Sequence, residues 1–276
     1  MKNTSIWGFL VVLVVGLLGV AYWKYDQEQA QQQATATEIK GVAPAALPEE
    51  SSIKYPIAPP AEPPQAPPSA EPATGGKTLP EAKGSDNAMR DLLIGLFGEK
   101  NGDIWILDHF AERFVLLVDS LPRRGLAIHR LPIQPAAGTF IIDGDEKDAV
   151  LSEENYRRYA VYVALLQGAD AGRLATVYRR HYPRFQEAYQ NLGYPDGYFN
   201  DRLMEVIDHM LAAPEATAPV RLERFAARYR FVDPELEALS AGEKVLLRMG
   251  PENALRIKEK LREIRRELVR QSQREG

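Results

Sequence analysis

The sequence contains no cysteine and carries little net charge. Its 276 residues therefore exclude disulfides, zinc–thiolate centres, iron–sulfur clusters and cysteine nucleophiles. Its 34 Lys and Arg residues nearly balance 38 Asp and Glu residues, so the net charge of −4 provides no general attraction for nucleic acid. P-loop, GxGxxG, GxSxG and HExxH motifs are also absent. We therefore expect no cofactor and no resident metal, and a binding protein is favoured over an enzyme.

One long hydrophobic run lies at the amino terminus. Residues 6–23 (IWGFLVVLVVGLLGVAYW) carry no charge over 18 positions. As a helix the run spans about 27 Å, close to the hydrocarbon thickness of a bilayer. Trp and Tyr residues lie at both of its ends, as at membrane interfaces. The alternative is a cleaved signal peptide, but no small-residue cleavage site follows directly. The sequence therefore predicts one uncleaved membrane anchor.

The orientation of this anchor depends on few charges. Lys2 and the terminal amine precede the run, whereas Lys24 is accompanied by Asp26 and Glu28 after it. The positive-inside rule then places residues 1–5 in the cytoplasm. Nearly all of the protein is expected on the far side of the membrane.

Residues 24–85 have the composition of a disordered linker rich in Gln, Pro and Ala. Eleven of the 20 prolines fall between Pro44 and Pro80. Proline fixes φ and removes a hydrogen-bond donor, so neither helix nor sheet propagates here. As an extended polyproline II helix, residues 44–80 alone reach about 115 Å. A spacer is favoured, and a docking ligand for a proline-recognising partner is the alternative.

Residues 86–276 are predicted to form a mainly α-helical domain with a small β-hairpin. Apolar residues recur at helical spacing in several stretches, and capping residues or Gly and Pro bound them. Residues 139–142 and 149–151 flank a turn and predict the hairpin, whereas residues 220–231 are extended in character but alternate imperfectly. The helices are expected over residues 86–97, 103–121, 152–167, 171–192, 199–213, a short stretch from 240, and 252–271.

The last of these helices has a regular apolar stripe. Its members recur at 3,4,3,4 spacing and are Ala254, Ile257, Leu261, Ile264 and Leu268. Such a stripe either docks onto the helix's own domain or forms a two-heptad seam with another chain. Docking is favoured because two heptads are short for an independent coiled coil, and the oligomeric state stays open.

Several motifs stand out between residues 113 and 254. They are RFV (113–115), DSLP (119–122), LGYPDGYFNDR (192–202), VIDH (206–209), DPELEALSAG (233–242) and LLRMGPENA (246–254). With these motifs the chain resembles one bacterial family, the domain of unknown function 3014, over roughly residues 88–270. The resemblance implies a membrane anchor, a variable linker and this domain, which in a bacterium places the anchor in the inner membrane and the domain in the periplasm. It brings no activity and no catalytic residues.

The GYPDGYFNDR loop and the helix after it form the candidate binding surface. Tyr and Arg are enriched on recognition surfaces. Tyr194 and Tyr198, in the turn-rich loop, are expected to be exposed, whereas Tyr178, Tyr182 and Tyr189 share a core stripe. The candidate residues are Tyr194, Asp196, Tyr198, Asn200, Asp201, Arg202, Glu205, Asp208 and His209.

The same helix also carries an acidic face. Asp201, Glu205 and Asp208 recur at i, i+4 and i+7, and His209 follows Glu205 by four. These residues have the chemistry to bind a divalent cation or to supply general acid–base groups. The simpler interpretation is helix capping by Asn200 or Asp201 together with ion pairs to arginines.

Two hypotheses for function follow. The favoured one is a binding or scaffolding module in the envelope, with an envelope protein or a cell-wall polymer as partner and no nucleic acid. The alternative is a metal-dependent or hydrolytic envelope enzyme that uses the acidic face.

Overall fold

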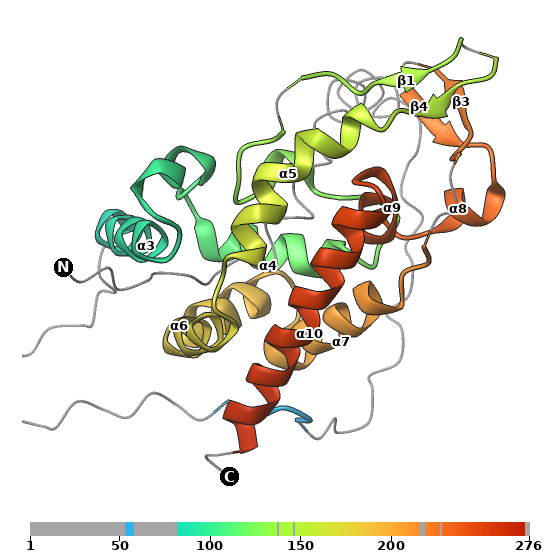
Figure 1. The fold of residues 1–276 in the computed structure, drawn as a ribbon. Coiled ribbons are helices and arrows are strands. Elements are labelled where there is room, and N and C mark those ends of the chain that lie inside the picture. The colour runs from blue at the N-terminus through green and yellow to red at the C-terminus, as the bar shows by residue number, and fades with distance from the viewer. Residues whose placement is uncertain are drawn as a thin grey trace, which may run out of the picture.

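The fold is built from helices packed around a long C-terminal helix. The computed structural model describes residues 53–57, 82–136, 138–145, 147–215, 219–226 and 228–273. In this part of the chain the α-helices are α3 (Ala82–Phe97), α4 (Phe110–Ser120), α5 (Glu154–Gln167), α6 (Ala171–Asn191), α7 (Phe199–Ala212), α8 (Pro234–Ala238), α9 (Ala241–Arg248) and α10 (Pro251–Gln273). Two 3-10 helices join them, η1 (Glu99–Ile104) and η2 (Ile128–Arg130). Figure 1 shows their arrangement.

Two short antiparallel hairpins lie together at one end of the domain (Figure 1). Strands β1 (Ile142–Asp143) and β2 (Val150–Leu151) form the first, and β3 (Leu222–Phe225) and β4 (Arg228–Phe231) the second. The amide of Leu222 donates to the carbonyl of Ala149 at 2.8 Å, which ties the hairpins to each other. The predicted fold class, mainly α with a small hairpin, is confirmed, and the second hairpin is an addition.

The membrane anchor predicted for residues 6–23 and most of the predicted linker lie outside the described residues. Within those residues, no helix combines the length and the apolar character required to cross a bilayer.

The helix predicted over residues 103–121 is shorter than expected. Residues before Phe110 leave the helix because Trp105 forms an isolated antiparallel bridge with Ile133. The amide of Gln134 also donates to the carbonyl of Ile104 at 2.7 Å. His109, at φ 52°, then turns the chain into α4. A buried bridge to a segment 28 positions downstream thus overrides a local helical pattern.

Helix α10 is the centre of the packing. It contacts α5, α6, α7 and α9, and α4 packs against α6 and α7. All five members of the predicted apolar stripe are buried within the domain. Of the two alternatives for this helix, the structure shows docking onto its own domain.

Two lysines of α10 are buried beside this stripe. The ammonium of Lys258 donates to the carbonyl of Ala213, directly after α7, and that of Lys260 donates to the carbonyl of Ala169, just after α5. Lys260 also pairs with Glu263, and Lys258 lies 3.9 Å from a carboxylate oxygen of Glu215. Carbonyls and carboxylates therefore satisfy the two buried ammonium groups, while the methylene chains of the lysines pack in the core.

Residues 53–57 lie against the domain although the sequence places them in the linker. Figure 1 shows this short blue segment beside the C-terminal end of α10. Tyr55 and Ile57 are half-buried and pack on the main hydrophobic core. Five residues with the composition of a linker thus have a defined position on the domain.

Gly250 lies between α9 and α10, where an added side chain is expected to lower stability. It has φ 87°, and Gly98, with φ 82°, serves as the comparison. A Cβ on Gly250 would lie 2.5 Å from the ring of Tyr156, whereas nothing lies within 4 Å of a Cβ on Gly98. Alanine strains the backbone at both positions, but only at 250 must it also displace a ring. We expect Gly250→Ala to lower the free energy of unfolding by about 1–3 kcal/mol more than Gly98→Ala does, in urea denaturation. Equal losses would show that the Tyr156 contact is unimportant.

Candidate functional site

The candidate site holds residues 53–57 through their main chain. The carboxylate of Asp201, in the first turn of α7, accepts from the amides of Lys54 at 2.9 Å and Tyr55 at 2.8 Å. A single carboxylate thus binds two consecutive peptide N–H groups. Such charge-assisted bonds are stronger than neutral ones.

Three further hydrogen bonds continue along the same segment. The hydroxyl oxygen of Tyr198 accepts from the amide of Ile57 at 2.6 Å. Asn200 donates through Nδ2 to the carbonyl of Tyr55 at 2.8 Å. Ser272, near the end of α10, donates to the carbonyl of Pro56 at 2.9 Å. All five bonds go to main-chain atoms of the segment, so they do not depend on particular side chains.

Two side chains of the segment face the domain. Tyr55 and Ile57 are half-buried, whereas Ile53, Lys54 and Pro56 are exposed. The chain bends at Lys54 and Tyr55, and at this bend two consecutive amides point to the same carboxylate, that of Asp201. The site therefore binds a bent main chain and contacts the side chains at 55 and 57.

Arg265 of α10 connects this site to Asp208. Its guanidinium binds Asp208 with two bonds, Nε–Oδ1 at 2.6 Å and Nη2–Oδ2 at 2.9 Å. The pKa of Arg265 is raised above its ordinary value, chiefly by its hydrogen bond with Asp208 and to a smaller extent by the side chain of Tyr55. Asp208 thus orients an arginine that faces the docked tyrosine.

The first turn of α7 is capped by α6, which leaves Asp201 available. Gln186 accepts the amide of Phe199 at 2.8 Å and donates to the carbonyl of Gly197 at 2.6 Å. The residue before the helix, Tyr198, makes no side-chain capping bond. The prediction that Asn200 or Asp201 caps this helix is therefore wrong, because a glutamine from the neighbouring helix takes that place.

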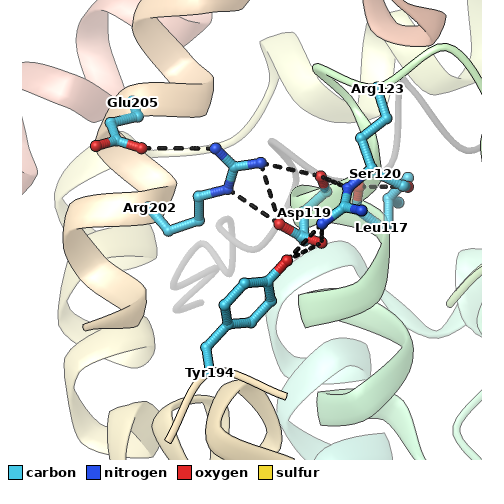
Figure 2. A network of polar contacts seen from close by, with 7 residues as sticks. All are labelled: Leu117, Asp119, Ser120, Arg123, Tyr194, Arg202 and Glu205. Carbon is cyan, nitrogen blue, oxygen red and sulfur yellow. Dashed lines mark hydrogen bonds and ion pairs between the residues drawn. The ribbon is translucent and has the colours of Figure 1, made fainter. Parts of the chain in front are cut away.

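A network around Asp119 supports the loop that precedes α7 (Figure 2). Asp119 is buried at the end of α4, and its carboxylate pairs with Arg123 at 2.6 Å and with Arg202 at 3.0 Å. The hydroxyl of Tyr194 donates to the same carboxylate at 3.4 Å. Its ring stacks on Tyr189 with centroids 4.6 Å apart. This network joins α4, the loop and α7 into one unit.

The expected exposure of Tyr194 and Tyr198 is wrong, since both rings are half-buried. The ring of Tyr194 packs on Tyr189, and that of Tyr198 lies 5.5 Å from Tyr182. Tyr182 and Tyr189 are buried in the core as predicted, and so is Tyr178.

The remaining candidate residues have separate partners. Glu205 pairs with Arg202 at 3.5 Å, and His209 lies 2.8 Å from the hydroxyl of Ser240. Asp196 is exposed at the tip of the loop. Among the described residues, no three potential metal ligands converge. The side chains of the acidic face therefore bind four different partners: the docked segment, another residue of α7, α10 and the start of α9.

Several residues of this site could not be predicted from the sequence. Tyr55 lies in a stretch with the composition of a linker. Arg265 and Ser272 lie on α10, for which the sequence predicted only an apolar stripe. Asp119 belonged to a motif of the family resemblance, but its partner Arg202 is 83 positions away. Only the packing of α10 and α4 against α7 brings these groups together.

Residues 110–265 match the family model described as Protein of unknown function (DUF3014). The match covers more than half of the chain and confirms the resemblance seen in the sequence. It includes Asp119, Asp201 and Arg265, whereas residues 53–57 and Ser272 lie outside it. Comparison with curated proteins and with solved structures gave no match.

The Asp119 network generates a second stability prediction. The Asp119 side chain is 6% exposed, against 24% for Arg202 and 54% for Arg123. Arg202→Met leaves a buried carboxylate with one solvated partner, so we expect a loss of about 2–3 kcal/mol in the free energy of unfolding. Arg123→Met removes the more exposed partner, and about 1 kcal/mol at most is expected.

Arg270→Met is the control for this comparison, because Arg270 is 49% exposed and pairs with Glu267 outside the network. Urea denaturation of the three variants gives the test. A loss for Arg202→Met no greater than that of the control would contradict a structural role for the network.

Proposed function

The chain belongs to the DUF3014 family, whose description names no activity, and from its site we propose that it is an envelope binding module for short peptide segments. The observation that carries this proposal is the seat of residues 53–57. Five hydrogen bonds from four side chains hold their main chain. Main-chain N–H and C=O groups are present in every peptide, so bonds to them recognise a peptide as such.

The chemistry of the site favours a protein partner over a cell-wall glycan. Asp201 and Tyr198 accept from amides, while Asn200 and Ser272 donate to carbonyls. Peptide groups offer this combination of donors and acceptors along one chain. The half-buried side chains at 55 and 57 then define the preference, an aromatic residue and an aliphatic residue two positions apart.

The chain's own segment leaves part of the site unused. Asn200 is 2% exposed, and its Oδ1 has no hydrogen-bond partner among the described residues. A partner that supplies one more donor would gain a bond that residues 53–57 do not make. The segment itself benefits from covalent attachment, since an intramolecular ligand has a high effective concentration. Residues 53–57 therefore act as a resident occupant that a partner displaces.

The location of the module belongs to the same proposal. An anchor at residues 6–23 and a proline-rich tether place the domain on the periplasmic side of the inner membrane. A binding domain on a long tether suits a scaffold that holds envelope proteins near the membrane.

The test uses the full-length chain with its own segment disabled. Tyr55→Ser/Ile57→Ser removes the two side chains that pack on the domain and so vacates the site. A fluorescent peptide of residues 50–60 is expected to bind this variant in trans, with weaker binding to the unaltered chain because the site is occupied. Adding Asp201→Ala to the variant should weaken peptide binding by about tenfold or more, since two charge-assisted bonds are lost. Fluorescence anisotropy gives the affinities.

Asp196→Ala in the same background is the matched control. Asp196 lies in the loop directly before α7, carries the same charge as Asp201 and is exposed. It should leave the affinity unchanged. No saturable binding to the vacated chain, or equal effects of both substitutions, would contradict the proposal.

Topology is tested separately with reporter fusions after Ser85. We expect a reporter that requires the periplasm to be active and one that requires the cytoplasm to be silent. The opposite pattern would overturn the orientation but would not affect peptide binding by the purified chain.

A further inference from the structure

A cavity that shares no residue with the peptide site lies beside the β3–β4 hairpin. Its three walls are the loop after α4, the hairpin, and α8 with α9. Its volume is about 340 Å³, which is within the range of small-molecule sites. Hereafter this is the cationic cavity. Its charged and aromatic lining residues are Arg124, Phe225, Arg228, Tyr229, Arg230, Glu237, Lys244 and Arg248.

The charge of this cavity departs from that of the whole chain. Among the described residues, four arginines and one lysine line it together with one carboxylate, Glu237. Glu237 pairs with Lys244 at 2.7 Å, and Glu223, outside the lining, pairs with Arg230 at 2.6 Å. Even with Glu223 included, the described cations outnumber these carboxylates five to two. A protein of net charge −4 thus gathers positive charge in one concave place.

Neighbouring rings and helices fix several of these cations. The guanidinium of Arg248 lies 5.3 Å from the ring centre of Phe231, and that of Arg230 lies 4.5 Å from that of Phe225. Stacking on a ring restricts the position of a guanidinium group. Phe225 is 48% exposed, so it also offers an apolar surface at the cavity mouth.

We propose that the cationic cavity binds the phosphate group of an organic phosphate. Guanidinium groups recognise phosphate oxygens with paired hydrogen bonds, and a phosphate monoester carries close to two negative charges at neutral pH. The cavity has room for a phosphate and an attached polar group, with Phe225 and Tyr229 beside it. Two sources share this chemistry, a soluble phosphate ester and the headgroup of an anionic phospholipid. None of the residues that bind the peptide segment line this cavity, so the proposal is independent of the peptide site.

The test compares two double variants of the full-length chain in a mild non-ionic detergent. Arg124→Gln/Arg230→Gln removes two exposed cations from different walls of the cavity. Arg256→Gln/Arg270→Gln is the control, because both residues are exposed on α10, pair with a glutamate, and give the same change in net charge. Calorimetric titration with glycerol phosphate at low ionic strength measures the soluble source. Co-sedimentation with vesicles of phosphatidylcholine, with and without phosphatidylglycerol, measures the lipid source.

We expect at least one probe to bind the unaltered chain and to lose about tenfold in affinity with the cavity variant, as removal of charge-assisted bonds predicts. The control variant should change the affinity by about twofold at most. Loss with glycerol phosphate assigns a soluble ester, and loss confined to phosphatidylglycerol vesicles assigns a headgroup. Equal weakening in both variants, or no saturable binding of either probe up to about 10 mM phosphate groups, would overturn the proposal.

Discussion

The domain depends on the burial of helix α10. Its apolar stripe fills the space between α5, α6 and α7. Its two buried lysines donate to the carbonyls of Ala213, directly after α7, and Ala169, just after α5. A buried cation is costly unless it has partners. The helix thus gives its neighbours both hydrophobic contacts and hydrogen bonds. Farther along α10, Arg265 lies beside Asp208 in the second half of α7, and Ser272 binds the docked segment.

That position of α10 explains why the acidic face of α7 is not one site. Asp201, Glu205 and Asp208 share a helical face, but seven residues extend about 10 Å along the axis. Over this distance the face meets different neighbours. Asp201 holds the docked segment, and Asp208 binds Arg265 of α10. Farther along, His209 meets the N-cap of α9 at Ser240. Carboxylates that lie close in sequence therefore serve different contacts, of which the peptide seat is the one with a ligand.

The two proposed sites divide the domain between two kinds of chemistry. The peptide seat uses one carboxylate, one amide and two hydroxyls to match peptide groups, and it partly buries the side chains at 55 and 57. The cationic cavity, beside the β3–β4 hairpin, uses charge and aromatic surface. Residues 53–57, which the sequence places in the linker, occupy the seat. Displacement of this segment would return those residues to the linker.

The sequence by itself determined the helical class, most helix positions and the burial of the α10 stripe, because these depend on local periodicity and caps. It also indicated Tyr198, Asn200 and Asp201 as a binding surface. It missed the β3–β4 hairpin, whose turn has Ala226 at φ 54° where glycine or asparagine is usual. Only the tertiary structure decided which groups meet. Arg202 reaches Asp119 across 83 positions, and Ser272 reaches Pro56 across 216. Such pairings depend on how whole helices pack, and no local pattern records them.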